Sequence, residues 1–398
     1  MIPEGMRDVL PAEAAALHAL EELLRARFAA YGYGEVRTPA LEFLETLELA
    51  DDDMVEGGYR VFDEQGRELM LRTDLTVPCA RLAATRFRER PLPLRFSYVA
   101  SAFRSPSASR AQDGEFAQAG VELIGASGPE ADAEVVALLC DVLAATGLPE
   151  FTVSLGTVAF HTAMVASLRL SPDQEQAVLD ALAARDYPLF ESIVGNADVD
   201  EASRRALQKA LDLGGGGEAV QQARKLAGSA GMEDAIDHLV QVRDIVEDYG
   251  FRDLVRIDFG LHPGLSYYTG VIVEAYASGT GLPVAQGGRY DNLLASFEWP
   301  VPAVGFAIAI DRLSMAMEDA RVVLPQRARP LAVAGGLQEP ALMAALRKAG
   351  LDALAVPVGE QPPREPALYR EGSQWVLRRG GRIARGSLKE LRRELEVP

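Results

Sequence analysis

Two consecutive runs of apolar, β-prone residues constrain the fold of this chain more than any other feature. They are "PLRFSYVASAFRS" and "GEFAQAGVELIGA", and the polar segment "SPSASRAQD" connects them. Apolar runs of this kind, bounded by polar turn residues, are typical of buried strands. We therefore expect two long antiparallel strands joined by a polar loop.

The rest of the chain places further strands beside groups of helices. Apolar residues recur at helical spacing in "PAEAAALHALEELLRARFAAYG", and the stretch from about 158 to 248 is helical throughout. Strand-like runs return in "YTGVIVEAYA" and "PVAQGGRYDNLL". Strands that pair in hairpins, with helices grouped beside them, predict an α+β fold in which helices flank an antiparallel sheet.

The length and the pattern of elements predict two domains. A chain of 398 residues is long enough for two or three, at roughly 100–200 residues each. We expect a core over residues 1–325, which includes the helical insertion at about 158–248. A small α/β domain follows over residues 326–398.

The charge of the chain is strongly acidic and unevenly distributed. Its formal net charge is −18. Residues 326–398 carry 13 Lys and Arg against 8 Asp and Glu, a net +5, which leaves −23 on residues 1–325. An acidic core repels nucleic-acid phosphates, so we expect no tRNA partner for it. The basic tail fits either an ordinary solvated surface or an interface for an acidic protein surface or RNA.

Several classes of protein are disfavoured by features that the sequence lacks. Cys79 and Cys140 are far apart in apolar surroundings, which indicates a reducing compartment. The N-terminus has no secretory pattern, and no run approaches 18 apolar residues, so we expect a cytoplasmic protein without a membrane partner. The four histidines are scattered, and no metal-ligand spacing occurs. We expect neither a metal nor a cofactor.

A set of polar residues lies in or beside the β-prone runs. In extended segments, Asp74 and Thr76 share one face, and so do Gln118 and Glu122. A carboxylate suits an α-ammonium group, an arginine suits an α-carboxylate, and a second carboxylate suits a side chain with an N–H donor. Together these residues predict a receptor for a free amino acid. The candidate residues are Asp74, Thr76, Arg104, Gln118, Glu122, Tyr268 and Tyr290.

From residue 3 to residue 313 the chain resembles the catalytic core of the class II histidyl-tRNA synthetases. "EVRTPALE" is similar to their motif 1, with Pro39 at the dimer interface, and "FRSP…GEFAQAGVELIG" is similar to motif 2. "GFAIAIDRL" is similar to motif 3, and "LSYYTG" to a histidine-specific signature. The resemblance implies a synthetase-like fold and a histidine pocket.

The resemblance also implies a role for each candidate residue. Asp74, Thr76 and Gln118 would hold the amino end of histidine, and Arg104 its carboxylate. Glu122 and Tyr268 would contact the imidazole, and Tyr290 would line the pocket. Asp74 stands where the synthetases have the longer glutamate.

The half of the site that would bind ATP departs from the synthetase pattern. Pro106 replaces the motif 2 glutamate that faces adenine, and Ala309 replaces the motif 3 glycine that leaves room for the base. Asp311 shortens the motif 3 acid, and Pro263 replaces an arginine that would stabilise the reacting groups. Losing one preorganised donor of that kind costs about 10²–10³ in rate. We therefore predict that the chain does not aminoacylate and has no catalytic residues.

This combination resembles the regulatory subunits of ATP phosphoribosyltransferase, which are synthetase paralogues. The resemblance implies a non-catalytic subunit in the first step of histidine biosynthesis, which senses histidine as a feedback effector. It further implies a short catalytic subunit as the partner, with a homodimer of this chain inside a hetero-octamer. The alternatives are an active histidyl-tRNA synthetase and a synthetase-like module that binds RNA or another protein.

Overall fold

The chain divides into two compact units, Met1–Leu324 and Pro325–Pro398. The computed structural model describes residues 2–49, 55, 57–105, 114–168, 170–183, 186–197, 199–211, 213–214, 218–261, 267–324, 330–357 and 365–395. Pro106 and Pro263, on which part of the sequence argument depends, lie outside the described residues.

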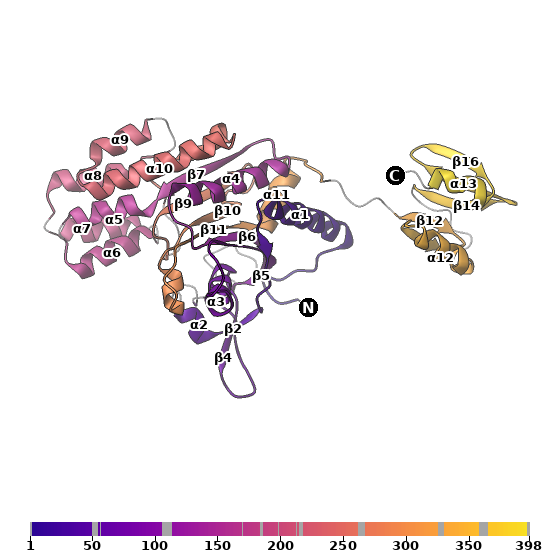
Figure 1. Cartoon of the computed structure of the whole chain (residues 1–398), viewed down its shortest axis with the longest axis horizontal. Coiled ribbons are helices and arrows are strands. Elements are labelled where there is room, and N and C mark those ends of the chain that lie inside the picture. Colours follow the sequence, from indigo (N-terminus) through magenta and orange to yellow (C-terminus); the bar gives the residue numbers. More distant parts are fainter. Residues whose placement is uncertain are drawn as a thin grey trace. The chain divides into compact units, whose positions relative to one another are not determined.

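The larger unit is built on an eight-stranded sheet in the order β1-β5-β6-β11-β10-β9-β7-β8 (Figure 1). Its strands are β1 (Gly34–Glu35), β5 (Leu94–Phe103), β6 (Glu115–Ile124), β7 (Phe151–Thr157), β8 (Val255–Ile257), β9 (Val271–Ala277), β10 (Ala285–Arg289) and β11 (Ala303–Ala309). Neighbours are antiparallel except for β1–β5 and β7–β8. The prediction of an α+β fold with an antiparallel sheet is confirmed.

The two apolar, β-prone runs over residues 93–105 and 114–126 form the longest hairpin of the sheet. Strands β5 and β6 pair over their full length, from Leu94 opposite Ile124 to Phe103 opposite Glu115. Successive side chains of a strand point to opposite faces of the sheet. Val121 and Leu123 therefore lie in the hydrophobic core on one face, whereas Gln118 and Glu122 point to the opposite face. The hairpin therefore supplies both a core surface and a polar surface.

Three helices cover the first face of the sheet: α1 (Pro11–Ala30), α4 (Pro129–Ala145) and α11 (Ile310–Asp319). Both α1 and α4 begin with proline at their first turn, where its missing N–H leaves no bond unmade. Helix α1 ends before Gly32, whose φ of +82° favours glycine. Phe28 of α1 packs against Phe306 of β11, with ring centroids 6.0 Å apart.

The opposite face of the sheet carries helix α3 (Thr76–Arg86), the short helix α2 (Leu44–Glu48) and the 3-10 turn η3 (Leu293–Phe297). A second sheet adjoins them, in the order β2 (Leu41–Phe43), β4 (Glu68–Leu71) and β3 (Arg60–Phe62). Val77, Ala80 and Ala83 of α3 share a core with Phe96 and Tyr290. This arrangement places α3 over the polar side of strand β6.

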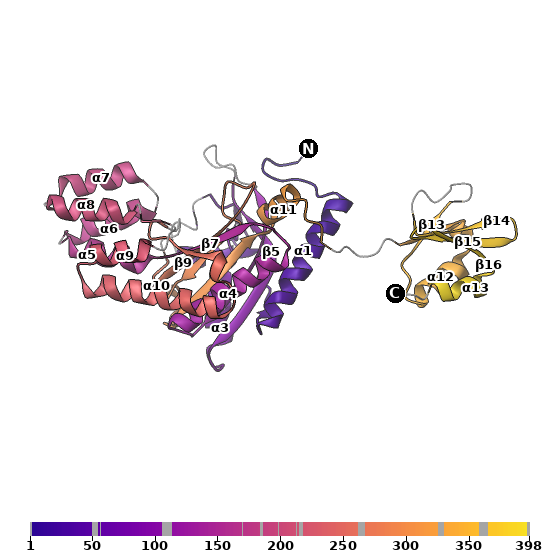
Figure 2. The same ribbon diagram turned by 90° about the horizontal axis from the view of Figure 1, so that it is seen from above.

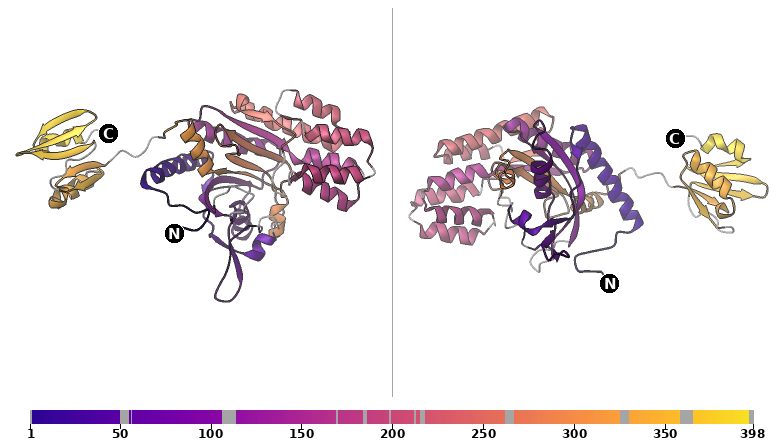
Figure 3. Two further views of the ribbon diagram at one scale, coloured as in Figure 1. Left: turned by 180° about the vertical axis from the view of Figure 1, so that it is seen from behind. Right: turned by 60° about the horizontal axis from the view of Figure 1, so that its bottom comes forward.

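The described residues between β7 and β8 form six helices, whose buried side chains belong to the same hydrophobic core as the sheet (Figures 1 and 3). They are α5 (Val158–Ser167), α6 (Pro172–Ala183), α7 (Tyr187–Asn196), α8 (Glu201–Leu211), α9 (Ala219–Leu226) and α10 (Ala230–Asp248). Helix α10 packs against α4 and α5, and Figure 2 shows it beside α4. The 3-10 turn η2 (Arg252–Leu254) leads back into β8.

The smaller unit has a five-stranded mixed sheet in the order β13-β12-β14-β15-β16. Its elements are β12 (Leu331–Ala334), η4 (Gly336–Gln338), α12 (Pro340–Lys348), β13 (Ala353–Val356), β14 (Ala367–Glu371), β15 (Gln374–Arg379), β16 (Arg382–Gly386) and α13 (Leu388–Leu395). Its own core contains Val333, Met343, Leu346, Leu368 and Leu391.

Among the residues that the structure describes, none of the helices is both long and apolar enough to span a bilayer. Cys79 and Cys140 are both free and buried.

Candidate functional site

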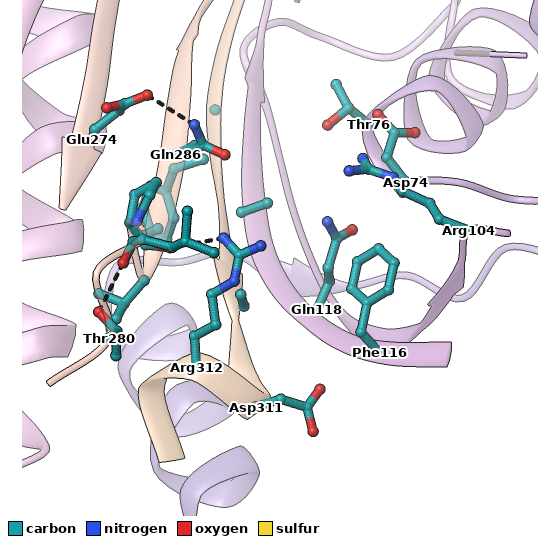
Figure 4. Close-up of a pocket in the computed structure, with 18 of the residues that line it drawn as sticks. Asp74, Thr76, Arg104, Phe116, Gln118, Glu274, Thr280, Gln286, Asp311 and Arg312 are labelled. Carbon is teal, nitrogen blue, oxygen red and sulfur yellow. Dashed lines mark hydrogen bonds between the residues drawn. The ribbon is translucent and has the colours of Figure 1, made fainter. Parts of the chain in front are cut away.

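A cavity with a volume of about 550 Å³ lies beside strands β6, β10 and β11, below helix α3. Figure 4 shows Asp74, Thr76, Arg104 and Gln118 on one side of it, with Glu274, Gln286 and Arg312 on the other. All seven residues that the sequence singled out line this cavity: Asp74, Thr76, Arg104, Gln118, Glu122, Tyr268 and Tyr290. The structure therefore brings together residues that are up to 216 positions apart in the chain.

Glu122 is the most deeply buried acid of the cavity, with 1% of its surface exposed. Its carboxylate accepts a hydrogen bond from the Tyr290 hydroxyl at Oε2 and one from the Tyr98 hydroxyl at Oε1, over 3.3 Å. Gly305 lies directly opposite on β11, and a Cβ there would come within 1.9 Å of Glu122 Oε2. Only glycine at position 305 leaves room for this carboxylate.

Burial raises the pKa of Glu122 to about 8, and the nearby Asp74 charge adds to the effect. Hydrogen bonds from Tyr290, Thr76 and Tyr98 oppose it, since they stabilise the charged form. At neutral pH the side chain therefore carries a proton most of the time. A carboxyl group in this state is suited to share a proton with a weakly basic ring nitrogen of a ligand.

Three tyrosines form one wall of the cavity, which we name the tyrosine wall: Tyr267, Tyr268 and Tyr290. The ring centroids of Tyr267 and Tyr268 are 4.8 Å apart, and those of Tyr267 and Tyr290 are 5.8 Å apart. Gly288 makes room for the wall, because a Cβ there would lie 2.7 Å from Tyr268 Cδ1. Burial raises the pKa of all three hydroxyls, so they remain neutral donors.

Other residues that line the cavity supply the polar groups that suit the two ends of an amino acid. Thr76 begins helix α3, and the buried Asp74 accepts from the Val77 N–H over 3.4 Å. The Arg104 guanidinium lies 5.4 Å from the centroid of the Phe116 ring. Gln118 Oε1 is buried and accepts no hydrogen bond from any described residue. A buried acceptor of this kind calls for a donor from outside the protein, because leaving it unmade costs about 1–3 kcal/mol.

The second half of the cavity is lined by Ala309, which stands at the position of the motif 3 glycine. Nearby, Glu274 Oε1 accepts from Gln286 Nε2 over 2.8 Å, and Arg312 Nη1 donates to the Pro283 carbonyl over 3.1 Å. The cavity thus continues past the amino-acid groups into a partly polar chamber.

Asp311 of motif 3 is engaged by other parts of the protein. Its Oδ2 accepts from the Ala117 N–H over 2.9 Å, and its Oδ1 lies 3.3 Å from Arg7 Nη2. Both carboxylate oxygens therefore have protein partners.

Sequence reasoning missed several residues of the site, among them Tyr98, Phe116, Glu274 and Gln286. Glu274 lies in an otherwise apolar strand, a signal of the same kind that identified Gln118 and Glu122, whereas Gln286 lies in a strand rich in glycine. Tyr98 gave no local signal, because its contact with Glu122 depends on the pairing of β5 with β6.

Comparison with known proteins places these features in a family. The sequence model described as Histidyl-tRNA synthetase matches residues 5–313. A protein of Moorella thermoacetica named ATP phosphoribosyltransferase regulatory subunit is 40% identical over 316 residues, which are 79% of this chain and 81% of that protein. A protein of the same name from Rubrobacter xylanophilus is 36% identical over 379 residues, 94% of this chain and 89% of that protein.

A solved structure supports the same relationship. A Bacillus halodurans protein, described as an ATP phosphoribosyltransferase regulatory subunit/histidyl-tRNA synthetase, superposes with a TM-score of 0.81 at 28% identity. The match covers 94% of this chain and 98% of that one.

Proposed function

The chain belongs to the family of ATP phosphoribosyltransferase regulatory subunits, which share the fold of histidyl-tRNA synthetases, and we propose that it binds histidine as a feedback effector. In this proposal it also activates a separate, short catalytic subunit in the first step of histidine biosynthesis, in the cytoplasm. The observation that carries the proposal is the cavity that joins a buried Glu122, the tyrosine wall and the amino-acid groups of α3 and β6.

Each end of histidine has a chemically matched group in this cavity. The α-ammonium group would donate to Asp74, Thr76 and the buried Gln118 Oε1, and Arg104 would bind the α-carboxylate. The imidazole would meet Glu122 and Tyr268, with Tyr290 holding the Glu122 carboxyl in place. Charge-assisted bonds of this kind contribute about 1.5–3 kcal/mol each, so three or four of them support binding near micromolar strength.

The alternative of an active synthetase has one observation in its favour, the open chamber between Phe116 and Arg312. We expect no ATP–pyrophosphate exchange, with or without histidine. Both oxygens of Asp311 are already engaged by Ala117 and Arg7, and the sequence has proline at 106 and 263 in place of groups that the reaction needs. Exchange of labelled pyrophosphate into ATP tests this directly. Histidine-dependent exchange would restore the enzyme as the preferred function.

A homodimer is also part of the proposal, and the small sheet β2-β4-β3 offers a surface for it. Leu41, Phe43 and Val61 are exposed, and the pairing of β4 with β2 and β3 places them on one face. Pro39, at the predicted interface, is exposed just before β2. An apolar face of this kind suits a second copy of the same chain across a twofold axis.

We expect Phe43→Lys to dissociate the dimer, because the twofold axis brings two like charges into an apolar contact. Phe62→Lys is the matched control, since Phe62 is exposed on the opposite face of the same sheet. Sedimentation velocity of both variants and the parent chain measures the outcome. A dimer that survives Phe43→Lys, or dissociates equally in both variants, would rule out this face.

A further inference from the structure

A buried ion pair lies behind the tyrosine wall, outside the cavity itself. Asp132, in the first turn of α4, has no exposed surface. Its Oδ1 accepts from Arg289 Nε over 2.8 Å and lies 2.6 Å from Nη2. Its Oδ2 lies 2.6 Å from His238 Nε2 on helix α10. A single carboxylate therefore joins α4, β10 and α10.

Arg289 holds together the two segments that carry the tyrosine wall. It directly precedes Tyr290, and its backbone carbonyl accepts from the Thr269 N–H over 2.8 Å. Its Nη1 also donates to Asp291 Oδ1 over 2.9 Å. The Asp291 N–H in turn donates to Thr269 Oγ1 over 3.1 Å. Because Thr269 follows Tyr268, these bonds fix the spacing between Tyr268 and Tyr290.

The segment that contains Tyr268 and the segment that contains Tyr290 pack closely against each other. Gly270 lies against Arg289, and a Cβ at that position would come within 3.0 Å of Arg289 Cδ. The side chain of Arg289 is only 6% exposed, so its position is set by protein contacts. A shift of the guanidinium would therefore change how Arg289 packs against Gly270 and bonds to Asp291.

His238 connects this ion pair to the helical insertion. Its side chain is 33% exposed, and α10 packs on both α4 and α5. One oxygen of the Asp132 carboxylate contacts Arg289, and the other contacts His238. Because His238 lies on α10, the position of α10 affects the orientation of the carboxylate. Such supporting contacts determine how accurately a binding group is held.

We propose that the Asp132–Arg289 pair positions the tyrosine wall for imidazole recognition, and that His238 couples this pair to helix α10 of the insertion. The inference rests on the proposed histidine function. His238 is a positioning residue, because it acts through Asp132 and Arg289 and does not line the cavity. Any partner that displaces α10 then alters histidine affinity through this contact.

The test compares His238→Leu with His238→Gln in the full chain. Glutamine keeps an N–H donor near the place of Nε2, whereas leucine removes it. We expect His238→Leu to weaken histidine binding about fivefold, at the low end of typical couplings between sites, and His238→Gln to stay within about twofold of the parent. Titration calorimetry measures the affinities, and circular dichroism confirms that both variants fold.

A double-mutant cycle separates positioning from a general loss of structure. The effect of His238→Leu should shrink in a Tyr290→Phe background, because both changes act on the tyrosine wall. It should persist in an Arg104→Lys background, because Arg104 is assigned to the α-carboxylate of histidine and not to the imidazole. Equal effects in both backgrounds would overturn the proposal.

Hydrogen exchange gives a readout that does not need histidine. His238→Leu should speed exchange at the Thr269 and Tyr290 amides, which are bonded to the Arg289 and Ala303 carbonyls. Unchanged exchange at both amides would refute the positioning role. If the parent chain failed to bind histidine, the proposed function would fail, and the exchange result alone would decide this inference.

Discussion

Glu122→Ala is expected to weaken histidine binding about 100-fold, the largest loss from any single change in the cavity. Glu122 is the buried acid nearest the tyrosine wall, and both of its oxygens are held by tyrosine hydroxyls. Without it, the imidazole loses its proton-sharing partner, and the hydroxyls of Tyr98 and Tyr290 lose their acceptor. Calorimetric titration with L-histidine measures the change.

Glu274→Gln is the matched control for this prediction. Glu274 is also a buried strand glutamate that lines the same cavity, but its carboxylate accepts from Gln286 and Tyr276. We expect its replacement to change histidine affinity by no more than about twofold, since glutamine keeps the size of the side chain and Glu274 has no assigned contact with either end of histidine. Equal losses in the two variants would contradict the assignment of Glu122 to the imidazole.

The second large effect concerns stability and pH. Burial raises the pKa of Glu122 to about 8 in the folded chain, from an ordinary value of 4.5. Between these values the folded state binds more protons than the unfolded state. The contribution of Glu122 to stability is therefore fully present below about pH 4.5 and is lost as pH rises toward 8.

Glu122→Gln removes this titration while keeping the size of the side chain. Between pH 5 and pH 8 we expect the variant to gain on the order of 3 kcal/mol in unfolding free energy relative to the parent. Urea unfolding of both proteins at a series of pH values measures the difference. Subtracting the unfolding free energy of the parent from that of the variant cancels the contributions of other groups. A difference that stays constant with pH would show that Glu122 is ionised throughout.

Much of the site was predictable from the sequence because it depends on local alternation. Gln118 and Glu122 are four positions apart in one strand, and the strand places both beneath α3. The β5–β6 hairpin followed from two apolar runs and a polar connection. Predicting such features requires only that the segment be identified as a β-strand.

Other features were not predictable, because they depend on contacts across the chain. In the sequence, Asp132 is an acid of the kind commonly found in the first turn of a helix. In the structure it contacts Arg289, 157 positions away, and His238, 106 positions away. Tyr98 meets Glu122 only because β5 and β6 pair in one particular register.

The central claim is that this chain recognises histidine, and calorimetric titration of the purified full chain with L-histidine tests it most directly. We predict a saturable transition with one site per chain and a dissociation constant near the micromolar range. A titration that shows no saturable heat at millimolar histidine would contradict the proposed sensor.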